Sequence, residues 1–314
     1  MIKILQGDAY DRMREIEDES IDCIVTSPPY WQLRDYGIDG QLGLEETVEE
    51  YLKKLIAVFD EAWRVLKDSG TVFVNIGDTY SNVNSKFISG SNNKNYRIDK
   101  QTAKTRKKSN IRRKSKMMIP ERFVIAMIER GWILRNEIIW HKPNVVPEAV
   151  NDRFTNDFEK IYFFTKNEKY YFEKQYEPYS EKTLTGFKDG IMPTGKKKML
   201  SAGESKTGMR EINKPWKAVY SENGRNMRTV WNIAAKGIKE AHFATFPEEL
   251  VRRCISAGCP ENGIVLDPFL GSGTSLKVAK KFNRNGIGIE LKKEYIEIAK
   301  QRIGDDLFNE VIVR

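Results

Sequence analysis

The stretch Asp267-Pro268-Phe269-Leu270-Gly271-Ser272-Gly273-Thr274-Ser275 decides the fold of this 314-residue chain. The apolar residues 264–266 before it are typical of a buried strand, and its Gly-Ser-Gly turn leads into a helical pattern. A second apolar run, residues 21–25, ends in the turn Thr26-Ser27-Pro28-Pro29-Tyr30-Trp31. Strands that end in such turns place reactive groups at the carboxyl edge of a sheet, where α/β folds bind ligands. The two turns together predict an α/β enzyme.

Strand and helix patterns alternate through the rest of the chain. Apolar spacing and end signals predict helices over residues 47–66, 120–131, 246–257, 275–282 and 294–302. Strands are predicted over residues 71–78, 133–140, 160–165, 263–267 and 286–290. Gly70 lies where a left-handed cap would end the first helix. This alternation predicts a doubly wound, mostly parallel sheet.

Composition excludes several classes of protein. No apolar run approaches the roughly 20 residues that a membrane-spanning helix needs, and the start of the chain turns polar too soon for a signal peptide. We therefore expect a cytoplasmic protein that does not enter a membrane. Cys23, Cys254 and Cys259 lack the spacing of metal ligands, so we expect reduced, structural cysteines and no metal site.

The net charge of +9 is concentrated in two segments. Residues 81–118 contain twelve Lys or Arg against one acid, Asp99, and residues 180–230 contain eleven basic residues against five acids. The remainder of the chain is net acidic. An acidic body with two basic segments is typical of an enzyme that binds a polyanion. The alternative is that each charge run is only a solvated surface.

These segments also suggest a division into domains. We expect a catalytic domain formed by residues 1–179 and 231–314, in which residues 81–118 form a basic, mobile loop too polar to pack. Residues 180–230 form the expected target-recognition region. Its candidate phosphate-binding residues are Lys196, Lys197 and Lys198, and its candidates for reading guanine edges are Arg210, Arg225 and Arg228.

The glycine-rich turn predicts a nucleoside cofactor. Gly271 and Gly273 let the backbone approach a ligand closely, and the helix that follows offers free N–H groups to a carboxylate. Glu290 ends the next predicted strand, where an acid can accept both hydroxyls of a ribose. The third glycine of the dinucleotide fingerprint and a Walker lysine are missing. S-adenosylmethionine, a nucleoside with a small carboxylate, therefore fits better than a dinucleotide or a nucleoside triphosphate.

The two motifs resemble those of the amino-group DNA methyltransferases. Because the Pro-Pro-Tyr motif precedes the glycine motif, the resemblance is to the circularly permuted β group. Three further segments resemble that family: Gln6-Gly7-Asp8-Ala9, Trp140-His141-Lys142-Pro143 and His242-Phe243-Ala244-Thr245-Phe246-Pro247. The resemblance implies a Rossmann-like fold of the S-adenosylmethionine-dependent type and double-stranded DNA as the substrate. A cognate restriction endonuclease, as in restriction-modification systems, and a homodimer stay open as further partners.

The resemblance also implies roles on the cofactor side. Asp267 would lie against the amino-acid end of the cofactor, Glu290 would hold the ribose, and Asp8 would accept from the adenine amino group. Thr245 and Phe246 would line the methionine side. The glycine motif completes the expected cofactor site with Phe269, Gly271, Ser272, Gly273 and Thr274. The alternatives are a turn residue for Asp8 and a core aromatic for Phe246, and no role is assigned to His141 or His242.

The Pro-Pro-Tyr turn answers a chemical problem of the transfer step, since the lone pair of an exocyclic amine is delocalised into its ring. The Ser27 hydroxyl and the Pro28 carbonyl can each accept one N–H hydrogen and draw the nitrogen toward tetrahedral geometry. Pro29 helps to fix the backbone that holds these acceptors. Tyr30, with Trp31 beside it, offers a ring face on which a flipped base can stack.

Asp78, at the end of its strand, is the candidate to orient the Ser27 hydroxyl or to take up the proton. The alternative is an acid that caps the segment after it. A cysteine nucleophile is disfavoured, because Pro29 stands where ring-carbon methylation would need Cys.

The first residue of the motif favours one target base. In the family, Ser before Pro-Pro-Tyr usually accompanies N4 of cytosine, and Asp or Asn usually accompanies N6 of adenine. We therefore predict a site-specific DNA methyltransferase that flips its base and methylates cytosine N4 by direct displacement, with adenine N6 as the alternative. An RNA or protein amide methyltransferase and an inactive DNA-binding module are further alternatives.

Overall fold

The fold is described from a computed structural model of the chain. The structure describes all residues except 34, 36, 39, 82–110, 146–147, 182–183, 185–220, 222, 236–245, 305–310 and 314. Several residues discussed in the sequence analysis therefore lie outside the described part. They are the candidate cofactor residue Thr245, the unassigned His242, and the candidate DNA-binding residues Lys196, Lys197, Lys198 and Arg210.

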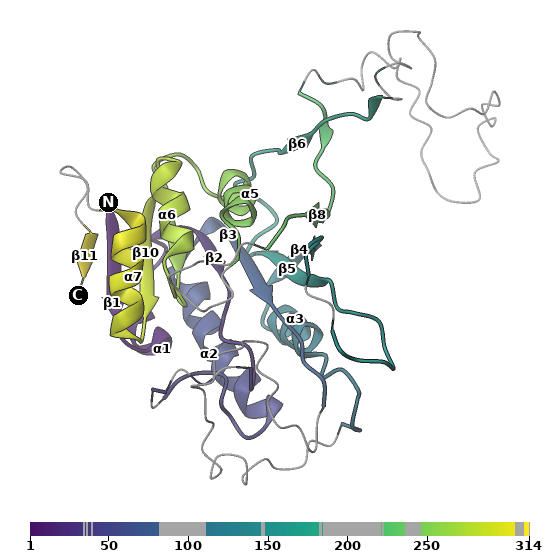
Figure 1. Cartoon of the computed structure of the whole chain (residues 1–314). Helices are drawn as coiled ribbons and strands as arrows, with labels where there is room; N and C mark the ends of the chain where they lie inside the picture. Colours follow the sequence, from purple (N-terminus) through teal and green to yellow (C-terminus); the bar gives the residue numbers. More distant parts are fainter. Residues whose placement is uncertain are drawn as a thin grey trace. The chain divides into compact units, whose positions relative to one another are not determined.

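In the described ranges, nine strands form one sheet in the order β11-β1-β10-β9-β2-β3-β5-β4-β8 (Figure 1). The strands are β1 (Ile2–Gln6), β2 (Ile21–Thr26), β3 (Leu66–Ile76), β4 (Ile133–His141), β5 (Phe158–Thr165), β8 (Val230–Asn232), β9 (Ile264–Asp267), β10 (Asn285–Glu290) and β11 (Val311–Val313). All neighbours pair in parallel except β5, which runs antiparallel to both β3 and β4. The prediction of a mostly parallel sheet is confirmed.

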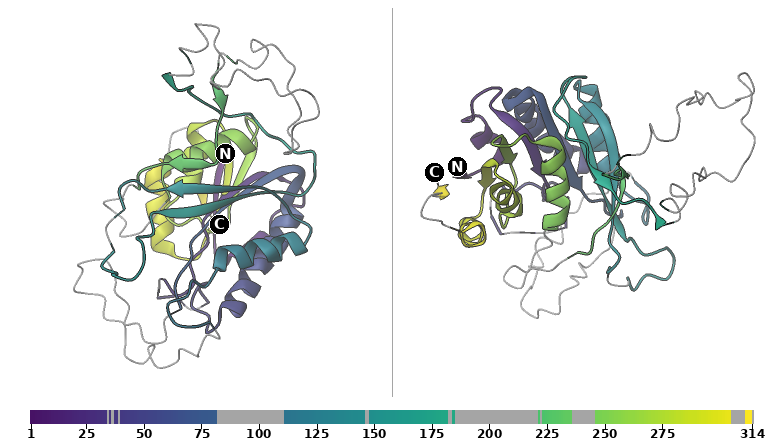
Figure 2. Two further views of the ribbon diagram at one scale, coloured as in Figure 1. Left: turned by 90° about the vertical axis from the view of Figure 1, so that its right-hand side faces the viewer. Right: turned by 90° about the horizontal axis from the view of Figure 1, so that it is seen from above.

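Helices cover both faces of this sheet (Figure 2). They are α1 (Ala9–Met13), α2 (Val48–Val65), α3 (Ile119–Glu129), α5 (Glu248–Gly258), α6 (Thr274–Lys281) and α7 (Lys293–Ile303). On one face, the larger core includes Phe59 of α2, Phe123 of α3 and Val74 of β3. On the other face, α6 and α7 bury Leu276 and Ile296 in a second cluster, and α5 lies against β2 and β3. The doubly wound architecture is therefore present.

Helix α2 begins as its sequence predicts but ends differently. Thr47 and Glu50 form a reciprocal capping box at its start. Gly70 does not cap its end, so that prediction is wrong: Leu66 is already extended, and Gly70 lies inside β3. The physical reason is that Leu66 is fully buried and opposite Ile21 in the sheet. The Lys166 ammonium donates to the Leu66 carbonyl at 2.9 Å in place of a cap.

The described residues divide into two compact units, residues 1–173 with 229–314 and residues 174–228. The smaller unit contains the two-stranded sheet of β6 (Tyr176–Glu177) and β7 (Arg225–Asn226). Within it, Glu177 pairs with Arg225 at 2.8 Å and with Arg228 at 2.5 Å. Two of the three arginines predicted to read guanine, Arg225 and Arg228, are thus ion-paired in this structure, and the target-recognition role of the segment stays a prediction.

The predicted mobile loop, residues 81–118, is described only at its two ends. These ends pair with each other: the N–H of Ser81 donates to the Ser115 carbonyl at 2.7 Å, and that of Met117 donates to the Thr79 carbonyl at 2.9 Å. Met117 is 1% exposed. Backbone pairing and a buried methionine thus hold the returning end, residues 111–118, while residues 82–110 of the predicted mobile loop lie outside the described part.

Among the residues that the structure describes, no helix is long and apolar enough to cross a membrane. Cys23, Cys254 and Cys259 are buried and form no disulfide, as predicted. Burial raises the pKa of Cys259 to about 12, and it raises the pKa of the other two thiols as well. All three are therefore protonated packing residues at neutral pH.

Candidate active site

The two motifs from opposite ends of the chain lie side by side at the carboxyl edge of the sheet. Strands β2 and β9 pair in parallel with Ile24 opposite Leu266, so the turns that follow them begin next to each other. Across this pair, Thr26 Oγ1 donates a 2.7 Å hydrogen bond to the Asp267 carboxylate. A single edge thus carries both predicted halves of the site.

Asp267 is buried beneath the glycine-rich turn. Its carboxylate accepts from Thr26, from the N–H of Phe269 at 3.0 Å and from Ser275 Oγ at 2.5 Å, and its side chain is 0% exposed. Burial raises the pKa of Asp267 to about 6, against the opposing effect of these donors. Asp267 therefore holds β2, the turn and α6 together. The structure does not expose it for the predicted contact with the amino-acid end of a cofactor.

Glu290, at the end of β10, supports the same turn. Its Oε2 accepts the N–H of Gly271 at 2.8 Å, and its Oε1 accepts the N–H of Lys292 at 2.8 Å. Burial raises the pKa of Glu290. The side chain keeps partial exposure, and each carboxylate oxygen can accept a further hydrogen bond. Glu290 is thus placed to accept two hydroxyl groups of one ligand.

The two glycines of the turn serve different purposes. Both have left-handed backbone, with φ of 54° at Gly271 and 82° at Gly273. A Cβ atom on Gly271 would meet no atom within 4 Å, whereas one on Gly273 would lie 2.8 Å from the Cβ atom of Ala299 in α7. Gly271 is therefore the open point of approach for a ligand. Gly273 mainly allows α7 to pack.

The hydroxyls of Ser272 and Thr274 contact α7. Arg302 donates to the Ser272 carbonyl at 2.6 Å, to the Ser272 hydroxyl and to Thr274 Oγ1 at 3.1 Å. Both residues are buried, and no side chain caps the start of α6. The N–H groups of Phe269, Leu270, Gly271 and Gly273 donate within the protein, so an anion would meet the uncapped start of α6 and not these hydroxyls. Sequence reasoning missed Arg302, because nothing in its local pattern separates it from a solvated helix residue.

Asp8 lies next to Glu290 at the same edge. Strand β1 pairs in parallel with β10, and the N–H of Gly7 donates to the Glu290 carbonyl at 3.0 Å. Asp8 caps α1 by accepting from the N–H groups of Tyr10 at 2.9 Å and Asp11 at 3.3 Å. The structure thus shows the turn contact that was the alternative for Asp8, and it also places the residue beside the predicted ribose acid.

Phe246 lies near the transfer half of the edge. It lines a small crevice together with Thr26 at the end of β2 and Asn75 near the end of β3. It is partly exposed and precedes α5, whose first turn has Pro247 as its cap residue. Its predicted contact with the methionine side of a cofactor stays a prediction, and its neighbour Thr245 lies outside the described residues.

A network of side chains surrounds the Pro-Pro-Tyr turn. Ser27 Oγ donates to Asn75 Oδ1 at 3.4 Å, and the Tyr30 hydroxyl donates to Glu159 Oε2 at 2.7 Å. The Asn75 amide donates to Glu159 Oε2 at 3.1 Å, and Lys142 pairs with the other oxygen of Glu159. Burial and the Glu159 carboxylate raise the pKa of Tyr30 well above its usual value. Ser27 and Tyr30 are thus held by one chain of contacts.

Sequence reasoning missed Asn75 and Glu159. Asn75 is 3% exposed and interrupts the apolar run of residues 72–76 at the end of β3, and this buried amide was the available signal. Glu159 reaches Tyr30 across 129 residues because β5 runs antiparallel to β3 and brings its amino end to this edge. No local pattern marks such a contact.

The turn itself is packed tightly. The Pro29 carbonyl accepts from the Tyr51 hydroxyl at 2.8 Å, and a Cβ atom on Gly77 would lie 2.3 Å from the Tyr30 ring. Trp31 is 7% exposed and donates through its indole N–H to the Glu45 carbonyl at 3.0 Å. The expectation that Trp31 helps to stack a base is wrong, because the ring belongs to the core.

Asp78 caps α3 in this structure. Its carboxylate accepts from the N–H groups of Thr79 at 2.9 Å, Met118 at 3.2 Å and Ile119 at 3.1 Å. Burial raises the pKa of Asp78. The hydroxyl of Ser27 is directed to Asn75 instead. Capping was the alternative for Asp78, and its proton-accepting role stays a prediction.

His141 ends β4 at the same edge. Its Nδ1 lies 2.8 Å from Asn232 Oδ1, and its Nε2 lies 3.5 Å from Asp157 Oδ2. These contacts place His141 one strand beyond Glu159 and link β4 to β8. They explain the residue without a role in transfer. His242 lies outside the described residues.

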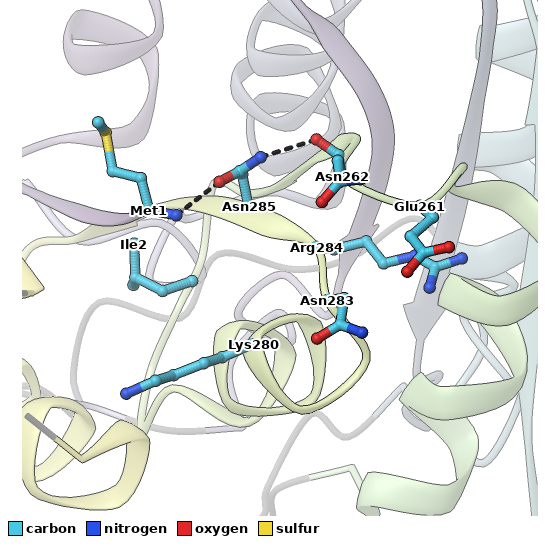
Figure 3. Close-up of a pocket in the computed structure, with 8 residues that line it drawn as sticks. All are labelled: Met1, Ile2, Glu261, Asn262, Lys280, Asn283, Arg284 and Asn285. Carbon is cyan, nitrogen blue, oxygen red and sulfur yellow. Dashed lines mark hydrogen bonds between the residues drawn. The ribbon is translucent and has the colours of Figure 1, made fainter. Parts of the chain in front are cut away.

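A cavity of about 330 Å³ lies at the opposite, amino edge of the sheet (Figure 3). It is lined by Met1, Ile2, Glu261, Asn262, Lys280, Asn283, Arg284 and Asn285. Asn285 bridges it, since its side chain accepts from the Met1 amine at 2.5 Å and donates to the Asn262 carbonyl at 2.7 Å. No residue of the two motifs lines this cavity, so the carboxyl edge is the candidate site.

Comparison with known proteins agrees with this geometry. Residues 21–301 match the model of the N6/N4 family of DNA methylases. The chain belongs to this family. The methylase is 39% identical to the Type II methyltransferase M.Cfr9I of Citrobacter freundii over 96% of its own length and 88% of that protein. It is 37% identical to the Type II methyltransferase M.SmaI of Serratia marcescens over 96% and 90% of the two chains.

Solved structures share the fold of the methylase. The cytosine-N4-specific PvuII DNA methyltransferase superposes with a TM-score of 0.62 at 19% identity, covering 98% of this chain and 88% of that chain. The complex of M1.HpyAVI with SAM superposes with a TM-score of 0.55 at 19% identity, covering 97% and 100%. The predicted Rossmann-like methyltransferase fold is therefore confirmed.

Proposed function

We propose that this methylase transfers a methyl group from S-adenosylmethionine to the exocyclic N4 amine of cytosine in duplex DNA. One observation carries the proposal: parallel pairing of β2 with β9 sets the Ser27 turn beside the glycine-rich turn. An amine held at the Ser27 turn, which follows β2, would then lie beside the glycine-rich turn, which follows the neighbouring strand β9. Membership of a DNA methylase family supports the reaction class.

The residues at the cofactor turn fit a nucleoside with a carboxylate. Space is open at Gly271, the start of α6 has no side-chain cap, and Glu290 keeps acceptor capacity on both oxygens. Asp8 and Glu290 would hold the adenosine end, and Phe246 and Thr245 would line the methionine end. When bound, S-adenosylmethionine supplies a methyl group on a positively charged sulfur. We propose a supporting role for Asp267, whose three internal hydrogen bonds fix the turn.

On the other side, the contacts of Ser27 suit an acceptor. Its hydroxyl proton points to Asn75 Oδ1, which leaves oxygen lone pairs for an amine N–H. The Pro28 carbonyl supplies the second acceptor. Two such acceptors favour tetrahedral nitrogen, so the lone pair is released for direct displacement as the amine gains methyl and loses a proton. Tyr30 would contact the flipped base, with Gly77 against its ring. Asp78 is the proposed destination of the proton.

The target base is the finer part of the proposal. Serine at position 27 and the fold shared with a cytosine-N4-specific enzyme favour cytosine, and adenine N6 is the alternative. The basic segments favour DNA over a protein amide. Residues 180–230 are the proposed target-recognition region. A cytoplasmic location, a cognate restriction endonuclease and a homodimer belong to the same proposal.

Nucleoside analysis tests it directly. The protein is incubated with plasmid DNA and S-adenosylmethionine, and the DNA is digested to nucleosides and examined by mass spectrometry. N4-methyl-2′-deoxycytidine is the expected product. N6-methyl-2′-deoxyadenosine would overturn the choice of base but keep the reaction class. Labelling of RNA or protein in the absence of DNA labelling would overturn the proposed substrate.

A further inference from the structure

The loop between β4 and β5, residues 142–157, is firmly held at both ends. The N–H of Lys142 donates to the Asp157 carbonyl at 2.7 Å, which closes the base of the loop. Asn144 exchanges two hydrogen bonds with the backbone of Ala235, at 2.8 and 2.9 Å. Further contacts come from Glu148, Asp152, Arg153 and Asn156, while residues 146–147 are not described.

Phe154 stands out on this loop. It is 96% exposed, more than any other large apolar side chain in the described part of the chain. The two residues before it are held: the Arg153 guanidinium lies 4.2 Å over the Tyr80 ring and pairs with Glu148, and Asp152 pairs with Lys114. A single exposed apolar residue is ordinary on a protein surface, so exposure alone assigns no role. A fully exposed aromatic ring beside held residues does offer a binding partner a large apolar area.

The surroundings of Phe154 suit a nucleic acid. Lys116 lies 6.0 Å from the centroid of the Tyr80 ring and 5.7 Å from that of Phe158, and Arg112 and Arg113 are exposed on the same returning segment. Glu148 pairs with Arg153 and Asp152 pairs with Lys114, but the remaining cations keep the surroundings of Phe154 basic. Phosphates would therefore be attracted to the place where Phe154 protrudes.

The loop also begins and ends beside the transfer residues. Lys142, at its start, pairs with Glu159, and Glu159 accepts from the Tyr30 hydroxyl at 2.7 Å. Tyr80, which Arg153 covers, follows β3 shortly after Asn75, the partner of Ser27. The protruding ring and the residues that would receive a flipped base thus belong to one continuous group of contacts.

We propose that Phe154 inserts into the DNA duplex and fills the space left by the flipped base. This inference rests on the proposed function, and the proposed binding partner of the Phe154 ring is duplex DNA. An apolar ring between base steps offsets part of the lost stacking and so favours the extrahelical base. The held loop keeps the ring in place before DNA arrives, so little ordering is needed on binding.

The test compares Phe154→Ala with the unchanged enzyme on two substrates. After the methylated site has been mapped on plasmid DNA, initial rates are measured on a paired duplex and on one with an abasic site opposite the target base. Phe154→Ala is expected to be about tenfold slower on the paired duplex and close to the unchanged enzyme on the abasic one, where the target is already unpaired. Phe154→Leu should recover part of the rate.

Phe172→Ala serves as the matched control, since Phe172 is also exposed, at 48%, but stacks on Phe163. It should leave both rates unchanged. Equal rates for Phe154→Ala and the unchanged enzyme on the paired duplex would overturn the inference, as would an equal loss on both substrates. A shift in oligomeric state would assign the ring to a second copy and also overturn it. If the unchanged enzyme methylates no DNA, the proposed function itself fails.

Discussion

The glycine-rich turn after β9 and the Pro-Pro-Tyr turn after β2 share one sheet edge but hold their groups in place by different means. At the first turn, Asp267, Glu290 and Arg302 hold the backbone, and no side chain caps the start of α6. At the second, side chains from two other strands, Asn75 of β3 and Glu159 of β5, orient Ser27 and Tyr30. Recognition by backbone depends on turn shape. Transfer chemistry depends on a side-chain network. Substitutions on the transfer side should therefore lower turnover, and those on the cofactor side should lower cofactor affinity.

The largest effect is expected for Ser27→Ala, which removes one acceptor for the amine. Turnover should fall by about 100-fold or more, the scale seen when one preorganised transition-state contact is lost. Cofactor affinity, measured by calorimetry with S-adenosylhomocysteine, should change less than about twofold, since no contact at the glycine-rich turn is altered. Ser20→Ala, on the loop before β2, is the control. A matching loss of cofactor affinity would contradict the division into two halves.

Asp267 should affect stability through its pKa. The pKa is about 6 in the folded protein and roughly 3.9 in an unfolded chain, so the folded state binds this proton more tightly. The contribution of the protonated Asp267 to the free energy of unfolding is fully present below pH about 4 and is lost as the pH rises through 6. Relative to Asp267→Asn, which does not titrate there, the free energy of unfolding should fall by up to about 3 kcal/mol across this range.

Urea unfolding at a series of pH values measures this difference. Asp60→Asn, an exposed acid on α2, is the control and should track the unchanged protein. If the difference between Asp267→Asn and the unchanged protein stays constant from pH 4 to 7, burial of an ionisable Asp267 is not what holds the turn.

Glu290→Gln should weaken cofactor binding by about tenfold, because a neutral amide replaces one of two carboxylate acceptors. Turnover at saturating cofactor should fall much less. Calorimetry gives the affinity, and rates at high S-adenosylmethionine give the turnover. Glu294→Gln, in the first turn of α7, is the matched control. An unchanged affinity would remove Glu290 from the cofactor site.

The two halves also differ in how far sequence predicts them. Helices α2 and α6 and strand β9 could be predicted, because periodicity and turn chemistry are local. The three-residue strands β8 and β11 are too short to show a pattern, and the early start of β3 depends on pairing of Leu66 with Ile21. At the site, the glycine-rich turn is contiguous in sequence and was predicted as a unit.

The network on the transfer side was not predicted, since it depends on the register between β3 and β5. That pairing sets Ile76 opposite Lys160 and thereby brings Glu159 to Asn75 and Tyr30. One polar residue in an apolar strand could suggest Asn75, but its partners come from tertiary structure. Motifs thus identify the residues that contact ligands, and the fold identifies those that position them.

Glu159→Gln tests that last distinction with the smallest expected effect. Gln keeps the size of the side chain but has one acceptor oxygen in place of two. The substitution therefore removes the negative charge that pairs with Lys142. The remaining oxygen cannot serve both Lys142 and the two donors Tyr30 and Asn75. Turnover should fall by about fivefold, equivalent to about 1 kcal/mol, through looser orientation of Ser27. Cofactor affinity should stay the same. Glu137→Gln, which contacts Lys160 instead, should leave turnover unchanged.

A positioning role for Glu159 also predicts that its effect on turnover depends on Ser27. In a double-mutant cycle, Glu159→Gln should cost almost nothing once Ser27→Ala is present, because there is then no hydroxyl to orient. Additive losses in turnover would show that Glu159 acts independently of Ser27. In that case the chain of contacts from Lys142 through Glu159 and Asn75 would stabilise the sheet edge without serving the transfer step.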